Sequence, residues 1–263
     1  MALYNETVQV LSNEKVGPRL YLLTVASPRI ASDLEPGQFV HMKVPRMEAH
    51  ILRRPFSVYA RDRERGTLDI LYQVVGFGTD HMTSLLPGEE CELIGPVGAV
   101  WNPPLQGRCL LVGGGVGAAP LFMLCEKLVA SEASVDVVLG AQTNDALVCR
   151  SRYAQLLGEE PRCATDDGSY GRAGFCTSLV EEALEEADAA GARYDYVAVC
   201  GPEPLMKIVA GIAATYGVRC EVSMEKRMAC GIGACLSCVV DTTEGKKRAC
   251  VDGPVFDARK VVW

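Results

Sequence analysis

The sequence of 263 residues has no long apolar run, no block of basic residues and only three histidines. Its longest uncharged stretch, "CLLVGGGVGAAPLFMLC", contains glycine and proline and is slightly short for a helix that crosses a bilayer. We read it as a strand, a tight turn and a helix. The first residues carry Glu6, Glu14 and Lys15 without a continuous apolar stretch, which fits neither a secretory signal nor a transit peptide. A cytoplasmic protein is expected.

The charge pattern excludes another class of partner. The formal net charge is −7 and the basic residues are scattered, which argues against nucleic acid or an anionic membrane surface as the main partner. With 49% apolar residues the chain can bury a large core, and its length exceeds one typical domain.

Three segments follow from the patterning, and together they predict a multi-domain β plus α/β protein. Residues 1–101 hold short β-runs between glycine, proline and charged turns, which predicts an antiparallel barrel. In residues 102–219 strands alternate with amphipathic helices, which predicts a doubly wound parallel sheet covered on both faces. Residues 220–263 carry little that could form a core of their own, so a small module held together by a metal or a bridge is expected there.

Twelve cysteines stand in a chain without an export signal, where thiols stay reduced. Disulfides are therefore disfavoured. Eight of the twelve, among them Cys91, Cys109 and Cys125, sit singly in apolar segments, where a buried thiol behaves as a small hydrophobic group.

The other four cysteines follow a plant-type pattern for a [2Fe–2S] cluster, C-x4-C-x2-C with a fourth cysteine beyond it. They are Cys230, Cys235, Cys238 and Cys250. Gly231 and Gly233 suit a loop that curls around the inorganic sulfides and donates N–H groups to them. Structural zinc usually takes paired C-x2-C knuckles or histidine, and no histidine follows His81. Zinc and unligated thiols remain as the alternatives.

"LVGGGVGAAP" follows an apolar strand and opens a helix, the context in which G-x-G-x-x-A indicates dinucleotide binding. Its residues Gly113, Gly115, Gly117 and Ala118 would let the backbone approach a pyrophosphate at the helix N-terminus. A tight turn without a ligand is the alternative.

The acidic residue that usually binds the adenine ribose is missing after the next strand, where "VDVVLGAQTND" has Gly140, Ala141 and Gln142. No arginine stands at 142–144 to hold a 2′-phosphate, which favours NAD over NADP. In "LRRPFSVYA", Arg53 and Arg54 beside a strand are either an anion site or exposed charges.

The order of these motifs, "RRPFS" and "GFGT", then "GGGVGAAP" and "CGPEPLM", then the cysteines, resembles the ferredoxin–NADP reductase superfamily. Within it, "MEKRMACGIGACLSCVV" with "KRACVDGPVF" is similar to the family of dihydroorotate dehydrogenase B electron-transfer subunits. The resemblance covers essentially the whole chain. Its cysteine segment is highly specific, "RPFS" moderately so, and the glycine motif is shared by many reductases.

The resemblance implies FAD in the barrel, NAD on the α/β domain and the cluster in the module. Arg54 would grip the FAD pyrophosphate, the strand edge with Ser57 would lie by the isoalloxazine, and Gly78 with Thr79 would meet the phosphates. The other residues that it implies are Pro55, Phe56, Leu71, Tyr72 and Gln73 for the flavin, and Cys200, Gly201 and Pro202 for a turn beside the nicotinamide. A buried thiol at Cys200, and a Gly-Pro pair that simply ends a strand, are the alternatives.

Nicotinamide moves two electrons together whereas an iron–sulfur cluster passes them singly, so a flavin is the natural converter. No acid/base triad is evident. The resemblance implies a catalytic FMN-containing dihydroorotate dehydrogenase subunit as partner, in a heterotetramer of two of each, in pyrimidine biosynthesis. Only eleven residues (239 to 249) separate the last two cluster cysteines, so the cluster is expected in a small module near the flavin and near a surface.

Two further hypotheses stay open. One is an NADPH-linked flavin and iron–sulfur subunit of a ferredoxin-dependent or sulfide reductase, and the other is a nucleotide-binding adaptor with a zinc clip. We expect no role for His41, His50 or His81, and we expect Trp263 to be a loose terminal side chain.

Overall fold

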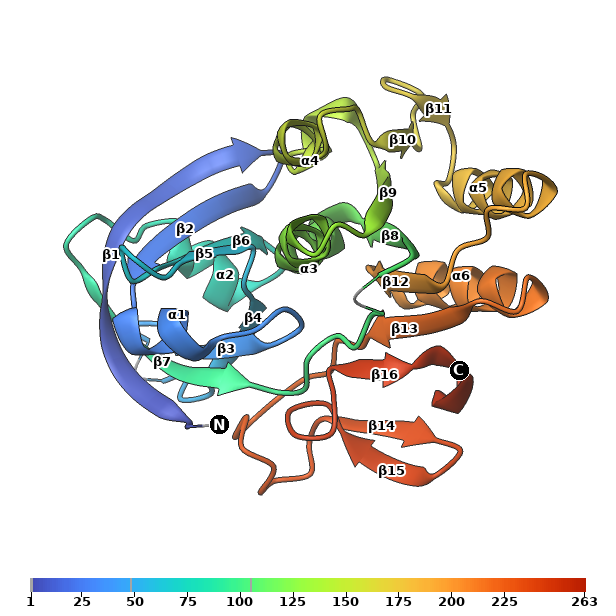
Figure 1. The fold of residues 1–263 in the computed structure, drawn as a ribbon. Helices are drawn as coiled ribbons and strands as arrows, with labels where there is room; N and C mark the ends of the chain where they lie inside the picture. The colour runs from blue at the N-terminus through green and yellow to red at the C-terminus, as the bar shows by residue number, and fades with distance from the viewer. Residues whose placement is uncertain (1, 48, 105) are drawn as a thin grey trace.

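The computed structural model describes residues 2–47, 49–104 and 106–263. Two seven-stranded sheets and one two-stranded hairpin make up its β-structure (Figure 1). Across these described ranges, no helix is both long enough and apolar enough to cross a membrane.

The first sheet is antiparallel, with strand order β4-β3-β7-β1-β2-β6-β5. Its strands are β1 (Tyr4–Gly17), β2 (Leu20–Ala26), β3 (Phe39–Lys43), β4 (Arg54–Ser57), β5 (Ala60–Asp62), β6 (Thr67–Gln73) and β7 (Glu90–Val97). Alternate residues such as Leu68 and Ile70 on β6 are fully buried, as the two-residue period of a strand requires. The edge strands β4 and β5 are consecutive in the chain, so the curved sheet is a nearly closed barrel, as predicted. Two short helices, α1 (Pro28–Asp33) and α2 (Phe77–Met82), lie between its strands.

The second sheet has the order β11-β10-β9-β8-β12-β13-β16 and is parallel except for its last strand. Its strands are β8 (Arg108–Gly114), β9 (Ser134–Ala141), β10 (Arg162–Thr165), β11 (Arg172–Ala173), β12 (Tyr196–Cys200), β13 (Arg219–Ser223) and β16 (Val255–Asp257). The helices are α3 (Ala119–Ala130), α4 (Arg150–Leu157), α5 (Thr177–Ala189) and α6 (Glu203–Thr215), with short 3-10 turns η1 (Gly115–Ala118), η2 (Asn144–Ala146) and η3 (Ala258–Lys260). Helices α3 and α4 cover one face and α5 and α6 the other (Figure 1). The predicted doubly wound α/β sheet is confirmed.

Strand β8 explains why this sheet is covered on both sides. Leu110 and Val112 belong to the hydrophobic cluster under α5 and α6, whereas Cys109 and Leu111 belong to the cluster under α3 and α4. Such a continuous apolar run is typical of a central parallel strand.

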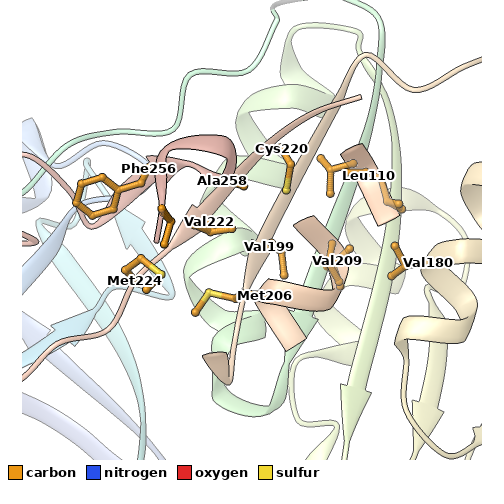
Figure 2. Packing of buried hydrophobic residues seen from close by; sticks show 14 of the residues in the cluster. Leu110, Val180, Val199, Met206, Val209, Cys220, Val222, Met224, Phe256 and Ala258 are labelled. Carbon is orange, nitrogen blue, oxygen red and sulfur yellow. The ribbon is translucent and has the colours of Figure 1, made fainter. Parts of the chain in front are cut away.

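The C-terminal segment consists of the hairpin β14 (Val239–Thr242) and β15 (Gly245–Arg248), followed by β16. Strand β16 pairs antiparallel with β13, and its Phe256 packs beside Met224 (Figure 2). The segment therefore shares its core with the α/β sheet. Strand β13 runs across the predicted boundary at 219/220. Trp263 is partly buried against this same core, so the expectation of a loose terminal side chain is wrong.

Candidate functional site

The four clustered cysteines are brought together by the β14–β15 hairpin. Cys238 precedes β14 and Cys250 follows β15, and the Ala249 N–H donates to the Cys238 carbonyl at 2.9 Å. The two sulfur atoms then lie 3.3 Å apart. Cys230 and Cys235 form a second pair, in which the Cys235 side chain lies near enough to influence the Cys230 pKa. The hairpin thus closes the long sequence gap to the fourth cysteine.

The loop around Cys230 favours a negatively charged sulfur. Desolvation raises the pKa of Cys230, but backbone N–H groups of Ile232, Cys235 and Ala234 and the side chain of Cys235 outweigh it and lower the pKa to about 6. The Ile232 N–H lies 3.5 Å from the sulfur. Burial, followed by the neighbouring Cys238, raises the pKa of Cys250 to about 12. Cys235 is exposed and the later pair is buried.

This arrangement distinguishes two kinds of metal site. Within the described part of the chain, no three histidine, cysteine or carboxylate side chains converge as the ligands of one ion would. The thiols form two neighbouring pairs instead. A binuclear cluster takes four thiolates, two at each iron, whereas structural zinc needs four ligands around a single point. The residues present therefore fit a [2Fe–2S] cluster better than zinc.

The loop glycines also have a packing reason. Gly231 has φ +70°, and a methyl group there would lie 2.5 Å from Nδ1 of His41. Gly233 has φ +84°, and a methyl group there would lie 2.6 Å from Val251. His41 is completely buried, and desolvation, followed by the charge of Arg53, lowers its pKa to about 4. No role was expected for His41, yet its ring contacts the cysteine loop.

The arginine pair before β4 divides into two roles. Arg53 donates from Nη2 to Glu92 at 2.7 Å and is largely buried, so it is a structural ion pair. Arg54 donates to the carbonyls of His50 and Leu52, and its Nε would lie 2.5 Å from a methyl group on Gly78. The structure thus brings Arg54 and Gly78 together, and their binding of one phosphate group stays a prediction.

Thr79 shapes this site from within. Its Oγ1 accepts the N–H groups of Val75 at 2.9 Å and Gly76 at 3.2 Å, and its side chain is buried. The hydroxyl is therefore committed to the turn before α2. Exposed Phe77, the first residue of α2, stacks on His50 with ring centroids 4.6 Å apart.

The predicted flavin strands present different faces. Tyr72 is buried in the barrel interior, donates its hydroxyl to Asn13 at 3.1 Å and packs against Phe56. Leu71 lies in the core between the barrel and the α/β domain, and Gln73 is exposed. On β4, the residues Pro55, Phe56 and Ser57 are half-buried, and among the described strands β4 pairs only with β3. Its other edge is free to face a ligand.

The glycine-rich turn after β8 meets the turn after β12 at the point where the strand order reverses, which is where doubly wound sheets bind ligands. A methyl group on Gly117 would lie 2.6 Å from the Cys200 carbonyl oxygen, and one on Gly113 would lie 2.6 Å from Ala118. Gly115 differs, because its φ is +56° and nothing lies within 4 Å of the space its side chain would take. Gly115 therefore borders the open side of the turn.

Cys200 ends β12 beside Gly201 and Pro202. Its thiol is buried and hydrogen-bonded with Ser223, and burial raises its pKa to about 12. Ser223 is the register partner of Cys200 on β13, and the charge of Glu225 also reaches the thiol. The thiol is protonated and enclosed, which supports the interpretation of Cys200 as a buried group.

Comparison with known proteins matches three successive stretches of the chain. Residues 7–101 match an oxidoreductase FAD-binding domain, residues 111–211 match an oxidoreductase NAD-binding domain, and residues 225–262 match the iron–sulfur cluster binding domain of dihydroorotate dehydrogenase B. A Desulforamulus reducens protein named as the electron transfer subunit of dihydroorotate dehydrogenase B (NAD(+)) is 37% identical over 260 residues, 97% of each chain. The chain belongs to this family of electron transfer subunits.

A second family member, from Geobacillus thermodenitrificans, is 37% identical and covers 98% of each chain. Among solved structures, one of an NADH-dependent reduced ferredoxin–NADP oxidoreductase, described in connection with flavin-based electron bifurcation, has a TM-score of 0.86 at 28% identity and covers 97% of this chain and 89% of that one. An Amycolatopsis cytochrome P450 reductase, at 23% identity and a TM-score of 0.68, covers 82% of this chain and 67% of that one and shares the fold.

Three residues of this electron transfer subunit were missed by sequence reasoning: His41, Ser223 and Glu225. Ser223 is the last residue of β13, the strand next to β12, and Glu225 follows it. The carboxyl ends of parallel strands share one edge of the sheet. That adjacency was the signal that could have found them. No local pattern indicated His41, because its contact with Gly231 joins segments 190 residues apart in the sequence (231 minus 41).

Proposed function

We propose that this chain is the electron transfer subunit of a dihydroorotate dehydrogenase B in pyrimidine biosynthesis. A catalytic partner that holds FMN oxidises dihydroorotate, and the electrons reach NAD⁺ by way of a [2Fe–2S] cluster and FAD on this chain. The observation that carries the proposal is the pairing of four thiols within residues 225–262, the stretch that matches the cluster domain of this enzyme.

The residues of the chain divide the work by site. The thiols of Cys230, Cys235, Cys238 and Cys250 hold the cluster. The FAD site comprises Arg54, Pro55, Phe56, Ser57, Gln73 and Gly78. Leu71, Tyr72 and Thr79 contribute their backbone only, since their side chains are buried. The NAD site comprises Gly113, Gly115, Gly117, Ala118, Gly201 and Pro202, with Cys200 contributing its backbone only, since its thiol is buried. When bound, the flavin converts between single electrons and a hydride, so the protein has to bind the cofactors, orient them and enclose them.

The division into 1–101, 102–219 and 220–263 is part of the proposal, with one adjustment. Since β13 spans Arg219–Ser223 within the α/β sheet, we place the start of the cluster module after that strand.

The surface around Cys235 suits a protein partner. Ile232 and Leu236 flank it with 53% and 64% of their surface exposed, and Val251 lies against the same loop. Clustered exposed apolar residues mark interaction sites. We propose that the FMN subunit docks here, in a heterotetramer of two of each. A cytoplasmic location suits the twelve cysteines, all of which are free of disulfide bonds.

A second candidate is favoured by the similarity to the ferredoxin–NADP oxidoreductase structure, which matches nearly the whole chain. In that case the nucleotide would be NADP(H) and the partner would not oxidise dihydroorotate. A zinc-clipped adaptor is disfavoured by the paired arrangement of the thiols.

The test is to purify the chain with its native partner and to measure dihydroorotate-dependent reduction of NAD⁺ and NADP⁺. We expect flavin and cluster absorption, reduction of NAD⁺, and a clear preference over NADP⁺. Preference for NADP⁺ without any response to dihydroorotate would favour the second candidate. A colourless protein with stoichiometric zinc would end both.

A further inference from the structure

His41 lies between the two predicted redox sites. On β3, Val40 and Met42 point into the barrel core, whereas Phe39 belongs to the core shared with the C-terminal segment. His41 alternates with Val40 and Met42, so it points out of the barrel, yet it is completely buried. What covers it is the cysteine loop, with Gly231 against Nδ1.

Backbone groups of two chain segments lie near the imidazole. Backbone groups of Arg53 and Cys230 interact with the ring, although neither ring nitrogen makes a hydrogen bond of normal geometry. A buried polar group without a good partner lowers stability, so an apolar side chain would serve packing better here. Arg53 precedes the residue proposed to hold the FAD pyrophosphate, and Cys230 is the first proposed cluster ligand. A single side chain thus contacts both segments.

We propose that His41 is a positioning residue that fixes the cysteine loop against β4 and so sets the separation and orientation of cluster and flavin. Its Nδ1 packs against the loop at Gly231, and backbone groups of Cys230 and Arg53 lie near the ring. Electron transfer between two bound centres falls steeply with their separation, so a side chain that fixes this spacing acts on the rate. This inference rests on the proposed function.

Substitutions at His41 can separate the contributions of the two ring nitrogens. Asparagine places an amide where Nδ1 stands, glutamine places one where Nε2 stands, and leucine removes both polar groups. Met42→Leu on the same strand is the matched control, because it conserves volume in the barrel core and does not face the loop.

The readouts are the EPR spectrum and midpoint potential of the reduced cluster, and the amide hydrogen exchange of residues 229–235, all in the full complex. We expect His41→Leu and His41→Gln to shift the spectrum and potential and to speed exchange in the loop about tenfold or more, in line with the effect of outer-shell partners on a metal site. His41→Asn and Met42→Leu should match the wild-type protein. Flavin content should be the same in all four.

The proposal is overturned if the asparagine and glutamine variants cannot be distinguished from each other, or if the leucine variant matches Met42→Leu in all three readouts. Should His41→Leu fail to fold, the comparison of asparagine with glutamine decides, since both are polar and differ only in reach. Absence of a cluster from the wild-type protein would refute the proposed function instead, so the two failures are distinguishable.

Discussion

At the residue scale, the cluster cysteines differ in exposure, and this has a consequence for electron flow. Cys235 is exposed whereas Cys238 and Cys250 are buried, so one end of the proposed cluster faces solvent. The proposed FAD site is on the barrel. Removal of a cluster ligand should therefore cut the path to the partner without cutting the path from NADH to the flavin.

Cys235→Ser tests this division. Loss of outer-shell partners already costs about 10- to 100-fold at metal sites, so loss of a ligand should lower dihydroorotate-dependent NAD⁺ reduction about 100-fold or more. NADH-to-dye activity on FAD should stay within about threefold, since no FAD residue is changed. Cys163→Ala, at a buried thiol outside the module, controls for loss of a cysteine. Equal loss of both activities in Cys235→Ser would contradict the division.

Arg54 is the residue on which FAD affinity should depend most. A charge-assisted hydrogen bond contributes about 1.5–3 kcal/mol, so Arg54→Ala should weaken FAD binding about 10- to 100-fold. Arg54→Lys should fall between, because lysine keeps the charge but loses the planar fork. Fluorescence titration of the flavin-free protein gives both constants. Arg63→Ala, at an exposed arginine paired with Glu35, is the control. An equal loss of FAD affinity in this variant would mean that the effect comes from the net charge of the protein and not from a contact of Arg54.

At the element scale, the two crossed turns at the edge of the α/β sheet separate packing from binding. Gly117 has no room for a side chain, because the Cys200 carbonyl stands 2.6 Å from where a methyl group would lie. Gly115 has room but a left-handed backbone with φ +56°. In this motif, Gly117 is therefore required by its close neighbours. Gly115 is required by its own backbone conformation and by the ligand proposed to bind beside it.

Gly117→Ala should lower the free energy of unfolding by about 1–3 kcal/mol through overpacking. Gly115→Ala should lower the free energy of unfolding by about 1–2 kcal/mol through backbone strain. For the same loss of stability, Gly115→Ala should raise the KM for NADH more than Gly117→Ala does. Thermal unfolding and steady-state kinetics measure the two effects. Gly211→Ala on α6, where the space around the residue is open, is the control. It should neither raise the KM for NADH nor lower the free energy of unfolding. Proportional changes in both variants would mean that Gly115 does not border the nucleotide.

Periodicity and spacing predicted the elements but not their long-range contacts. The apolar run of β8 and the alternation along β6 indicate strands from neighbouring residues alone, and the C-x4-C-x2-C spacing indicates a cluster. By contrast, β16 joins the sheet beside β13 across the whole cysteine segment, and His41 meets Gly231 from the other end of the chain. These contacts depend on how separate units pack, for which one sequence carries no local signal.

The burial of Thr79 is a further case. A threonine after glycine in "GFGT" reads as a phosphate ligand, yet its hydroxyl closes the turn by accepting two backbone N–H groups. Serine and threonine hydroxyls at such positions compete between backbone and ligand, and the sequence does not decide which one prevails.

At the scale of the whole molecule, one hydrophobic cluster joins all three parts. It includes Phe39 and Val97 of the barrel, Val199 of the α/β sheet, and Cys238 and Cys250 of the cluster segment. Cluster, flavin and nucleotide sites are therefore held on one continuous core, while the apolar residues around Cys235 remain outside it.

Those outer residues should carry the partner interface. Ile232→Ser combined with Leu236→Ser should weaken association with the FMN subunit about tenfold or more, as expected when central apolar contacts are removed. Iron and flavin contents should not change. Ile208→Ser on α6, where a comparably exposed isoleucine lies away from the cysteine loop, is the matched control. Analytical ultracentrifugation measures the affinity of each variant for the FMN subunit. A larger loss of affinity in Ile208→Ser than in the double variant would mean that the interface lies elsewhere.

The most direct test of the account is low-temperature EPR of the dithionite-reduced protein, with spins counted against the chain. Four thiols in two pairs predict about one unpaired spin per chain, from a one-electron-reduced two-iron centre. A silent spectrum from anaerobically reconstituted protein that contains no iron would contradict the account.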